Sequence, residues 1–98
     1  METWRVFITP AADRVLKKLP KKVQAFAENE FPALVRNSPL MGILLSPPLE
    51  RLRSFHFSFE GKPYRIAYSL DFKARKIYIH YADYRGGFYE RLKRALRK

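Results

Sequence analysis

The stretch Tyr64–Tyr89, YRIAYSLDFKARKIYIHYADYRGGFY, decides the fold of this 98-residue chain. Large apolar residues alternate with polar or small ones over 64–70 and again over 77–82. Alternation with a period of two is typical of strands that have one buried and one open face. The five residues 71–75 between the two runs suit a hairpin loop. The stretch therefore predicts two antiparallel strands of one sheet, with Arg65 in the middle of the open face.

The N-terminal part predicts a strand that leads directly into a helix. Residues 4–8 (WRVFI) have the composition of a short strand. Thr9 and Pro10 are typical of a helix start, because a hydroxyl can cap the first turn and proline suits the first helical position. We expect this helix to end at Pro20, since proline cannot continue it.

A second helix is expected from Lys21 to about Arg36. Its apolar residues recur at helical spacing, and Pro32 lies inside the pattern. Pro32 should kink the helix near Glu28-Asn29 or split it there. The two helices form a hairpin that can cover one face of the sheet.

A third strand of the sheet is expected over 51–60, where three phenylalanines alternate with polar residues. The segment 61–63 (GKP) should turn the chain into the strand that begins at Tyr64. Together these strands form an antiparallel meander, with the strand 4–8 added at one side. The tail 87–98 predicts a helix with one apolar and one basic side. The prediction is a single α+β domain over 1–98.

The open face of this sheet should be polar and basic. A second covering layer would require apolar residues on it, so we interpret it as uncovered and functional. The residues expected there are Ser54, His56, Ser58, Arg65, Ser69, Tyr78 and His80.

The connector 37–48 (NSPLMGILLSPP) is more apolar than a free loop requires. Its prolines and Gly42 argue against a long regular element. We expect its apolar residues to pack against the domain edge, or otherwise to form a groove for a partner.

Charge and composition narrow the function classes. Twenty Lys and Arg against nine Asp and Glu give a net charge of +11, which attracts polyanions such as nucleic acid. The absence of cysteine excludes disulfides and thiolate metal sites. No metal or other cofactor is expected. Without an apolar run long enough for a membrane span or a signal-peptide pattern, we expect a soluble, cytoplasmic protein.

Three segments of the chain resemble the RelE/ParE toxin superfamily. GKPYRIAYSLD is similar to that family's strand with a G-x-YR-x-x-Y pattern, and places Arg65 at its arginine. HYADYRGGFY is similar to the final strand and its exit, where an arginine precedes a tyrosine by four residues, here Arg85 and Tyr89. LKKLPKKVQ resembles the family's helical hairpin. The order of elements and the length agree as well, so the resemblance covers nearly the whole chain.

The resemblance implies a toxin of a type II toxin–antitoxin system with a RelE-like fold. The RelE branch consists of endoribonucleases that cleave mRNA without metal, usually on the ribosome. The ParE branch inhibits DNA gyrase. Members of both branches are held inactive by a cognate antitoxin, which the charge of this chain predicts to be acidic.

The candidate catalytic residues are therefore Arg65, Arg85, Tyr89 and His56. The two arginines could stabilise charge on the scissile phosphate. Tyr89 could stack on a base or transfer a proton, and His56 could act as the base. His56 and Ser58 stand where RelE-type enzymes carry lysines. The candidate RNA-binding residues are Arg51, Arg53, Lys62 and His80.

Two further functions stay open at this point. One is a ParE-like inhibitor of DNA gyrase. The other is a non-catalytic protein that binds RNA or the ribosome through a decayed site.

Overall fold

The alternating runs fold, as predicted, into two long strands at the centre of a five-stranded sheet in the order β1-β5-β4-β3-β2. The computed structural model describes residues 3–84 and 86–97. β1 is parallel to β5, and the other pairs are antiparallel. The strands are β1 (Arg5–Ile8), β2 (Ile43–Leu44), β3 (Leu52–Phe59), β4 (Lys62–Asp71) and β5 (Lys76–Asp83).

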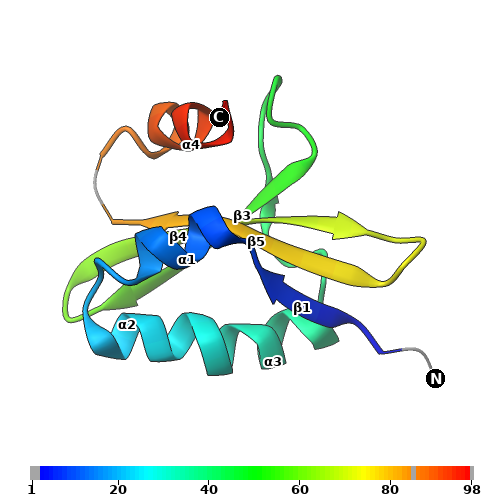
Figure 1. The fold of residues 1–98 in the computed structure, drawn as a ribbon, viewed down its shortest axis with the longest axis horizontal. Helices are drawn as coiled ribbons and strands as arrows, with labels where there is room; N and C mark the ends of the chain where they lie inside the picture. The colour runs from blue at the N-terminus through cyan, green and yellow to red at the C-terminus, as the bar shows by residue number, and fades with distance from the viewer. Residues whose placement is uncertain (1–2, 85, 98) are drawn as a thin grey trace.

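Helices lie on both sides of this sheet, as Figure 1 shows. They are α1 (Pro10–Leu16), α2 (Lys21–Ala25), α3 (Phe31–Asn37) and α4 (Phe88–Leu96), with the π-helical turn η1 (Phe26–Glu30) between α2 and α3. α2, η1 and α3 run beneath the sheet in this view, and α4 lies above it. The α+β meander fold is confirmed. None of the helices in the described ranges is long and apolar enough to cross a membrane.

Local signals in the sequence place the helices. Thr9 caps α1, because its Oγ1 accepts a hydrogen bond of 3.1 Å from the backbone N–H of Ala12. Pro32 interrupts the second helix as predicted, and η1 absorbs the interruption. Proline lacks the N–H of an α-helical hydrogen bond and its ring clashes with the preceding turn, so a local widening of the helix relieves both problems.

The main core fills the space between the sheet and the helices α1 to α3. Its aromatic part is a stack in which Phe26 lies 4.3 Å from Phe57, ring centre to ring centre, and Phe31 lies 5.2 Å from Phe55. The buried members of the core are Trp4, Ala12, Leu16, Ala27, Phe31, Val35, Ile66, Tyr68, Ile77, Ile79 and Ala82.

A β-bulge in β5 changes which side chains face this core. Ile79 is opposite Tyr68, but Tyr81 is opposite Ala67, so β5 has one residue more than β4 over this interval. The extra residue reverses the faces beyond it. Tyr81 faces away from the main core and Ala82 faces into it. An unbroken alternation over 77–82 predicts the reverse, with Tyr81 buried and Ala82 on the open face, and that prediction is wrong.

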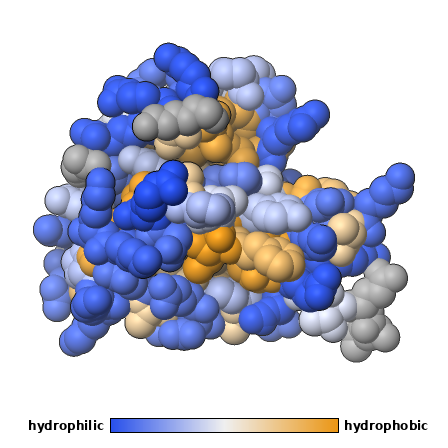
Figure 2. Space-filling model, viewed as in Figure 1, coloured by the Kyte–Doolittle hydropathy of each residue, from blue (hydrophilic) through white to orange (hydrophobic). Residues whose placement is uncertain are grey.

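The face expected to be open is covered at its centre by α4. Phe88 and Leu92 of α4 pack with a second cluster of buried residues, Leu49, Leu52, Ala67 and Tyr81. The apolar side of α4 is buried here, because leaving it in water would cost the hydrophobic gain of burial. The expectation of an uncovered face is therefore corrected, and open surface remains at the two ends of the sheet. In Figure 2 hydrophilic side chains cover most of the view, and hydrophobic ones emerge below α4.

The connector 37–48 meets its prediction only in part. Met41 and Leu45 pack against the domain as expected. Ile43 and Leu44 form the short edge strand β2 with side chains 62 % and 54 % exposed, and Leu40 is also exposed. Packing against the domain edge was therefore wrong for these three residues. The connector is held instead through Tyr68, whose hydroxyl accepts a hydrogen bond from the N–H of Gly42 (2.9 Å) and donates one to the carbonyl of Pro39 (2.9 Å).

Candidate functional site

One row of side chains crosses three strands at the end of the sheet near the 60–61 turn. His56 on β3 is opposite Arg65 on β4, and Arg65 is opposite Asp83 on β5. Partners directly opposite each other in an antiparallel sheet point to the same face with Cβ atoms about 5 Å apart. A base, a cation and a carboxylate are thus neighbours beyond the edge of α4.

Arg65 is exposed and available to a ligand. Its Cζ lies 5.8 Å from the ring centre of Phe88, at the start of α4. Over residues 3–84 and 86–97, no hydrogen bond or ion pair engages its guanidinium. A hollow of about 280 Å³ opens beside it, lined by Pro63, Arg65, Asp83, Tyr84, Gly86 and Gly87. A bidentate cation at the wall of a hollow suits a phosphate group.

His56 is held in its neutral form near pH 7. Partial burial lowers the pKa of its imidazole below the usual 6.5, and the positive charge of Arg65 lowers it further. Both effects disfavour the imidazolium form. A neutral imidazole next to a fixed cation can accept a proton, which is what a general base must do.

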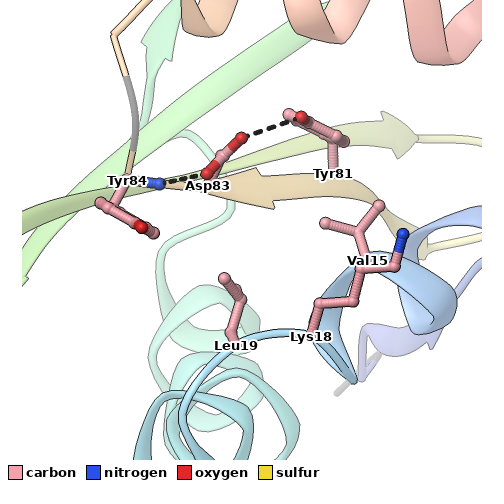
Figure 3. A pocket seen from close by; sticks show the side chains of 6 residues that line it. All are labelled: Val15, Lys18, Leu19, Tyr81, Asp83 and Tyr84. Atoms are coloured by element: carbon pink, nitrogen blue, oxygen red, sulfur yellow. Dashed lines mark hydrogen bonds between the residues drawn. The ribbon is translucent and has the colours of Figure 1, made fainter.

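Asp83 is the member of the row that the sequence analysis did not identify. It is buried, and its carboxylate accepts hydrogen bonds from the hydroxyl of Tyr81 (3.0 Å) and from the backbone N–H of Tyr84 (2.7 Å). Figure 3 shows it between these residues, facing Val15, Lys18 and Leu19 across a second hollow of about 350 Å³. Strict alternation along β5 would have placed the Asp83 side chain on the core side of the sheet. The β5 bulge places it instead on the face of Arg65.

Lys62 belongs to the same end of the sheet. Its Nζ lies 4.7 Å from the ring centre of Tyr84, which also lines the hollow beside Arg65. Arg85, one of the predicted catalytic residues, lies outside the described residues. Its neighbours Tyr84 and Gly86 both line this hollow.

Tyr89 is directed to a different part of the molecule. Its hydroxyl lies 2.8 Å from the carbonyl oxygen of Ser46 and 2.7 Å from that of Pro47, and donates its hydrogen bond to them. The Nζ of Lys93 lies 5.3 Å from its ring centre. In this arrangement Tyr89 ties α4 to the connector.

The remaining predicted RNA-binding residues lie at the opposite end of the sheet. Arg53 donates to the carbonyls of Leu40 (3.2 Å) and Gly42 (3.0 Å), and so braces the connector. Arg51 is exposed. His80 is half-buried, with Nε2 2.8 Å from Ser69 Oγ, and burial lowers its pKa. The structure thus groups His56, Arg65 and Lys62 at one end, and separates them from these three. Among the described residues, no cluster of His, Asp or Glu could hold a metal ion.

The family model described as "ParE-like toxin of type II bacterial toxin-antitoxin system" matches residues 6–93. No curated protein matched the chain.

Solved structures give a second comparison. The chain is 30 % identical to a chain of the RelBE2 toxin–antitoxin complex of Mycobacterium tuberculosis, covering 86 % of this chain and 100 % of that one with a TM-score of 0.69. A mutant of Escherichia coli RelE in the free state is similar in fold, with a TM-score of 0.75, 12 % identity and coverage of 98 % and 97 %. The RelE–RelB complex of Pyrococcus horikoshii gives a TM-score of 0.56, 24 % identity and coverage of 88 % and 99 %.

Proposed function

Because this chain belongs to the ParE-like toxin family of type II toxin–antitoxin systems, we propose that it is an endoribonuclease that cleaves mRNA on the ribosome. The observation that carries the proposal is that His56, whose lowered pKa favours the neutral form, lies opposite Arg65. Arg65 lines a hollow, and within residues 3–84 and 86–97 its guanidinium forms no hydrogen bond or ion pair. The similarity in fold to Escherichia coli RelE is consistent with this proposal.

The proposed reaction uses the RNA's own 2′-hydroxyl as the nucleophile. The O2′–P bond forms while the P–O5′ bond breaks, which leaves a 2′,3′-cyclic phosphate and a 5′-hydroxyl. His56 accepts the proton of the 2′-hydroxyl, and Arg65 stabilises the negative charge that develops on the phosphorus oxygens. The leaving 5′-oxygen must take up a proton. Tyr89 is the sequence-predicted candidate for this transfer, and it would have to release its hydrogen bond to the carbonyls of Ser46 and Pro47 to make it.

An acidic antitoxin is the proposed inhibitor. The neighbours from Mycobacterium tuberculosis and Pyrococcus horikoshii were solved as toxin–antitoxin complexes, and the net charge of +11 favours an acidic partner. A small acidic protein encoded beside this chain should co-purify with it and suppress its activity.

Inhibition of DNA gyrase is the second candidate. The matching family model is described as ParE-like, and His56 and Ser58 stand where RelE-type enzymes carry lysines. The same purified protein distinguishes the two functions. Cleavage of a reporter mRNA in a translation extract, mapped by primer extension, supports the endoribonuclease. Intact mRNA together with inhibited supercoiling supports the gyrase inhibitor. Ribosome binding without either effect contradicts both.

A further inference from the structure

A row of partly exposed rings lies at the other end of the face that carries Arg65. Phe7 on the edge strand β1 is opposite Tyr78 on β5, and Tyr78 is opposite Ser69 on β4. Ser69 and Arg65 are four residues apart on one strand, so they share a face and lie about 13 Å apart. At this end of the face Phe7 is exposed, and Tyr78 and Ser69 are half-buried.

The rings are already stacked on one another. The ring centres of Phe7 and Tyr78 are 5.6 Å apart with an interplanar angle of 26°, and His80 follows 6.4 Å from Tyr78. Phe7 is 39 % exposed although it sits on a strand whose neighbours Val6 and Ile8 pack into the core. The stacked residues Phe7 and Tyr78 are called the aromatic platform below.

Two cations flank the platform. Arg5 and Lys76 are opposite each other on β1 and β5, with Arg5 Cζ 5.8 Å and Lys76 Nζ 5.7 Å from the ring centre of Phe7. Neither forms an ion pair with a carboxylate in the described parts of the chain. Asp71, the residue opposite Lys76, uses its Oδ1 to accept from the N–H of Ala74 (3.0 Å). The two positive charges are thus free to meet an anion.

We propose that the aromatic platform is a second RNA subsite, which stacks unpaired bases while Arg5 and Lys76 hold the adjacent phosphates. Accessible rings on a sheet, together with neighbouring cations, are typical of proteins that bind single-stranded nucleic acid. The rings stack on the faces of the bases, and the cations meet the charges of the phosphodiester linkages. Half-burial of His80 lowers its pKa and favours an uncharged imidazole beside Tyr78. A purely apolar protein partner would not require the two unpaired cations. The inference rests on the proposed function only in taking RNA as the ligand.

The test is direct binding, which does not depend on cleavage. A fluorescent single-stranded RNA of roughly ten nucleotides, carrying 2′-O-methyl groups so that it cannot be cut, is titrated with the full chain at fixed low salt. Phe7→Leu and Tyr78→Ala should each weaken binding by about tenfold. Tyr78→Phe keeps the ring and should bind like the wild type. Leu34→Ala removes an exposed apolar side chain from α3 and serves as the matched control.

The outcomes separate this inference from the proposed cleavage. Unchanged affinity in Phe7→Leu and Tyr78→Ala, with folding verified by circular dichroism, would overturn the platform even if the protein cuts mRNA. Loss of binding in these variants would support it even if no mRNA is cut. If the variants bind RNA normally but lose the antitoxin, the platform is a protein-docking surface and the RNA assignment is wrong.

Discussion

His56 and Arg65 lie directly opposite each other on β3 and β4, and the charge of the arginine helps to keep the histidine neutral. The relationship places a proton acceptor beside a cation without an ion pair between them. It also means that a change to one residue should be measurable at the other.

The pKa of His56 should therefore respond to Arg65. In the wild type it lies below 6.5 because of burial and the guanidinium, and Arg65→Ala removes the second cause. We expect NMR titration to show a higher pKa for His56 in Arg65→Ala, with His80 unchanged because only burial shifts it. An unchanged His56, or equal shifts at both histidines, would contradict the assigned proximity.

Both histidines should also make the fold sensitive to mild acid. Their pKa values are lowered in the folded protein, so the unfolded chain binds more protons below the unfolded value of 6.5. Their stabilising contribution is complete above that pH and is lost as the pH falls through the folded values. Urea unfolding between about pH 7.5 and about pH 5 should show this decline, and it should be smaller in His80→Asn. Parallel declines in the two proteins would refute the role of His80.

Gly42 should tolerate no side chain. A Cβ atom there would lie 2.8 Å from the hydroxyl oxygen of Tyr68, which bonds both Gly42 and Pro39. We expect Gly42→Ala to lower the free energy of unfolding by about 1–3 kcal/mol, through crowding and a displaced hydrogen bond. Gly86→Ala is the control, since a Cβ there meets nothing within 4 Å. Equal unfolding midpoints for the two variants would disprove the close approach.

Tyr89→Phe tests whether the Tyr89 hydroxyl, at the start of α4, stabilises the fold or takes part in the reaction. Loss of the hydroxyl removes the hydrogen bond to the carbonyls of Ser46 and Pro47, at an expected cost of about 1 kcal/mol. Faster hydrogen exchange in α4 should accompany it. If cleavage falls while exchange and stability stay unchanged, the hydroxyl takes part in the reaction and the tether is of no consequence.

Elements specified by local chemistry were predictable from the sequence. The alternation in β4, the Thr9 cap with Pro10, and the interruption at Pro32 each depend on neighbouring residues alone, and each is confirmed. His56 and Arg65 were expected on one face for the same reason, because the parity of each strand is a local property. That they lie directly opposite each other depends, in addition, only on the register of the β3–β4 hairpin.

Features that depend on distant packing were not predictable. The bulge in β5 moves Tyr81 and Asp83 to the outer face, and no residue type in the run 77–83 requires an extra residue there. Ala67 lies between Arg65 and Ser69 on the side of β4 that was expected to be polar, yet it packs in the apolar cluster that receives Phe88 and Leu92. Amphipathicity of the tail helix was evident, but the sequence does not state which surface it covers.

The central claim is that Arg65 acts at the cleavage site, and one comparison tests it most directly. Wild type, Arg65→Ala and Arg14→Ala are added to a translation extract at equal concentration, and mRNA ends are mapped by primer extension. Arg14 is exposed on α1, so its variant loses the same charge elsewhere. We predict that Arg65→Ala slows cleavage by about a hundredfold or more while Arg14→Ala cuts like the wild type. Equal cleavage by Arg65→Ala and the wild type would contradict the account.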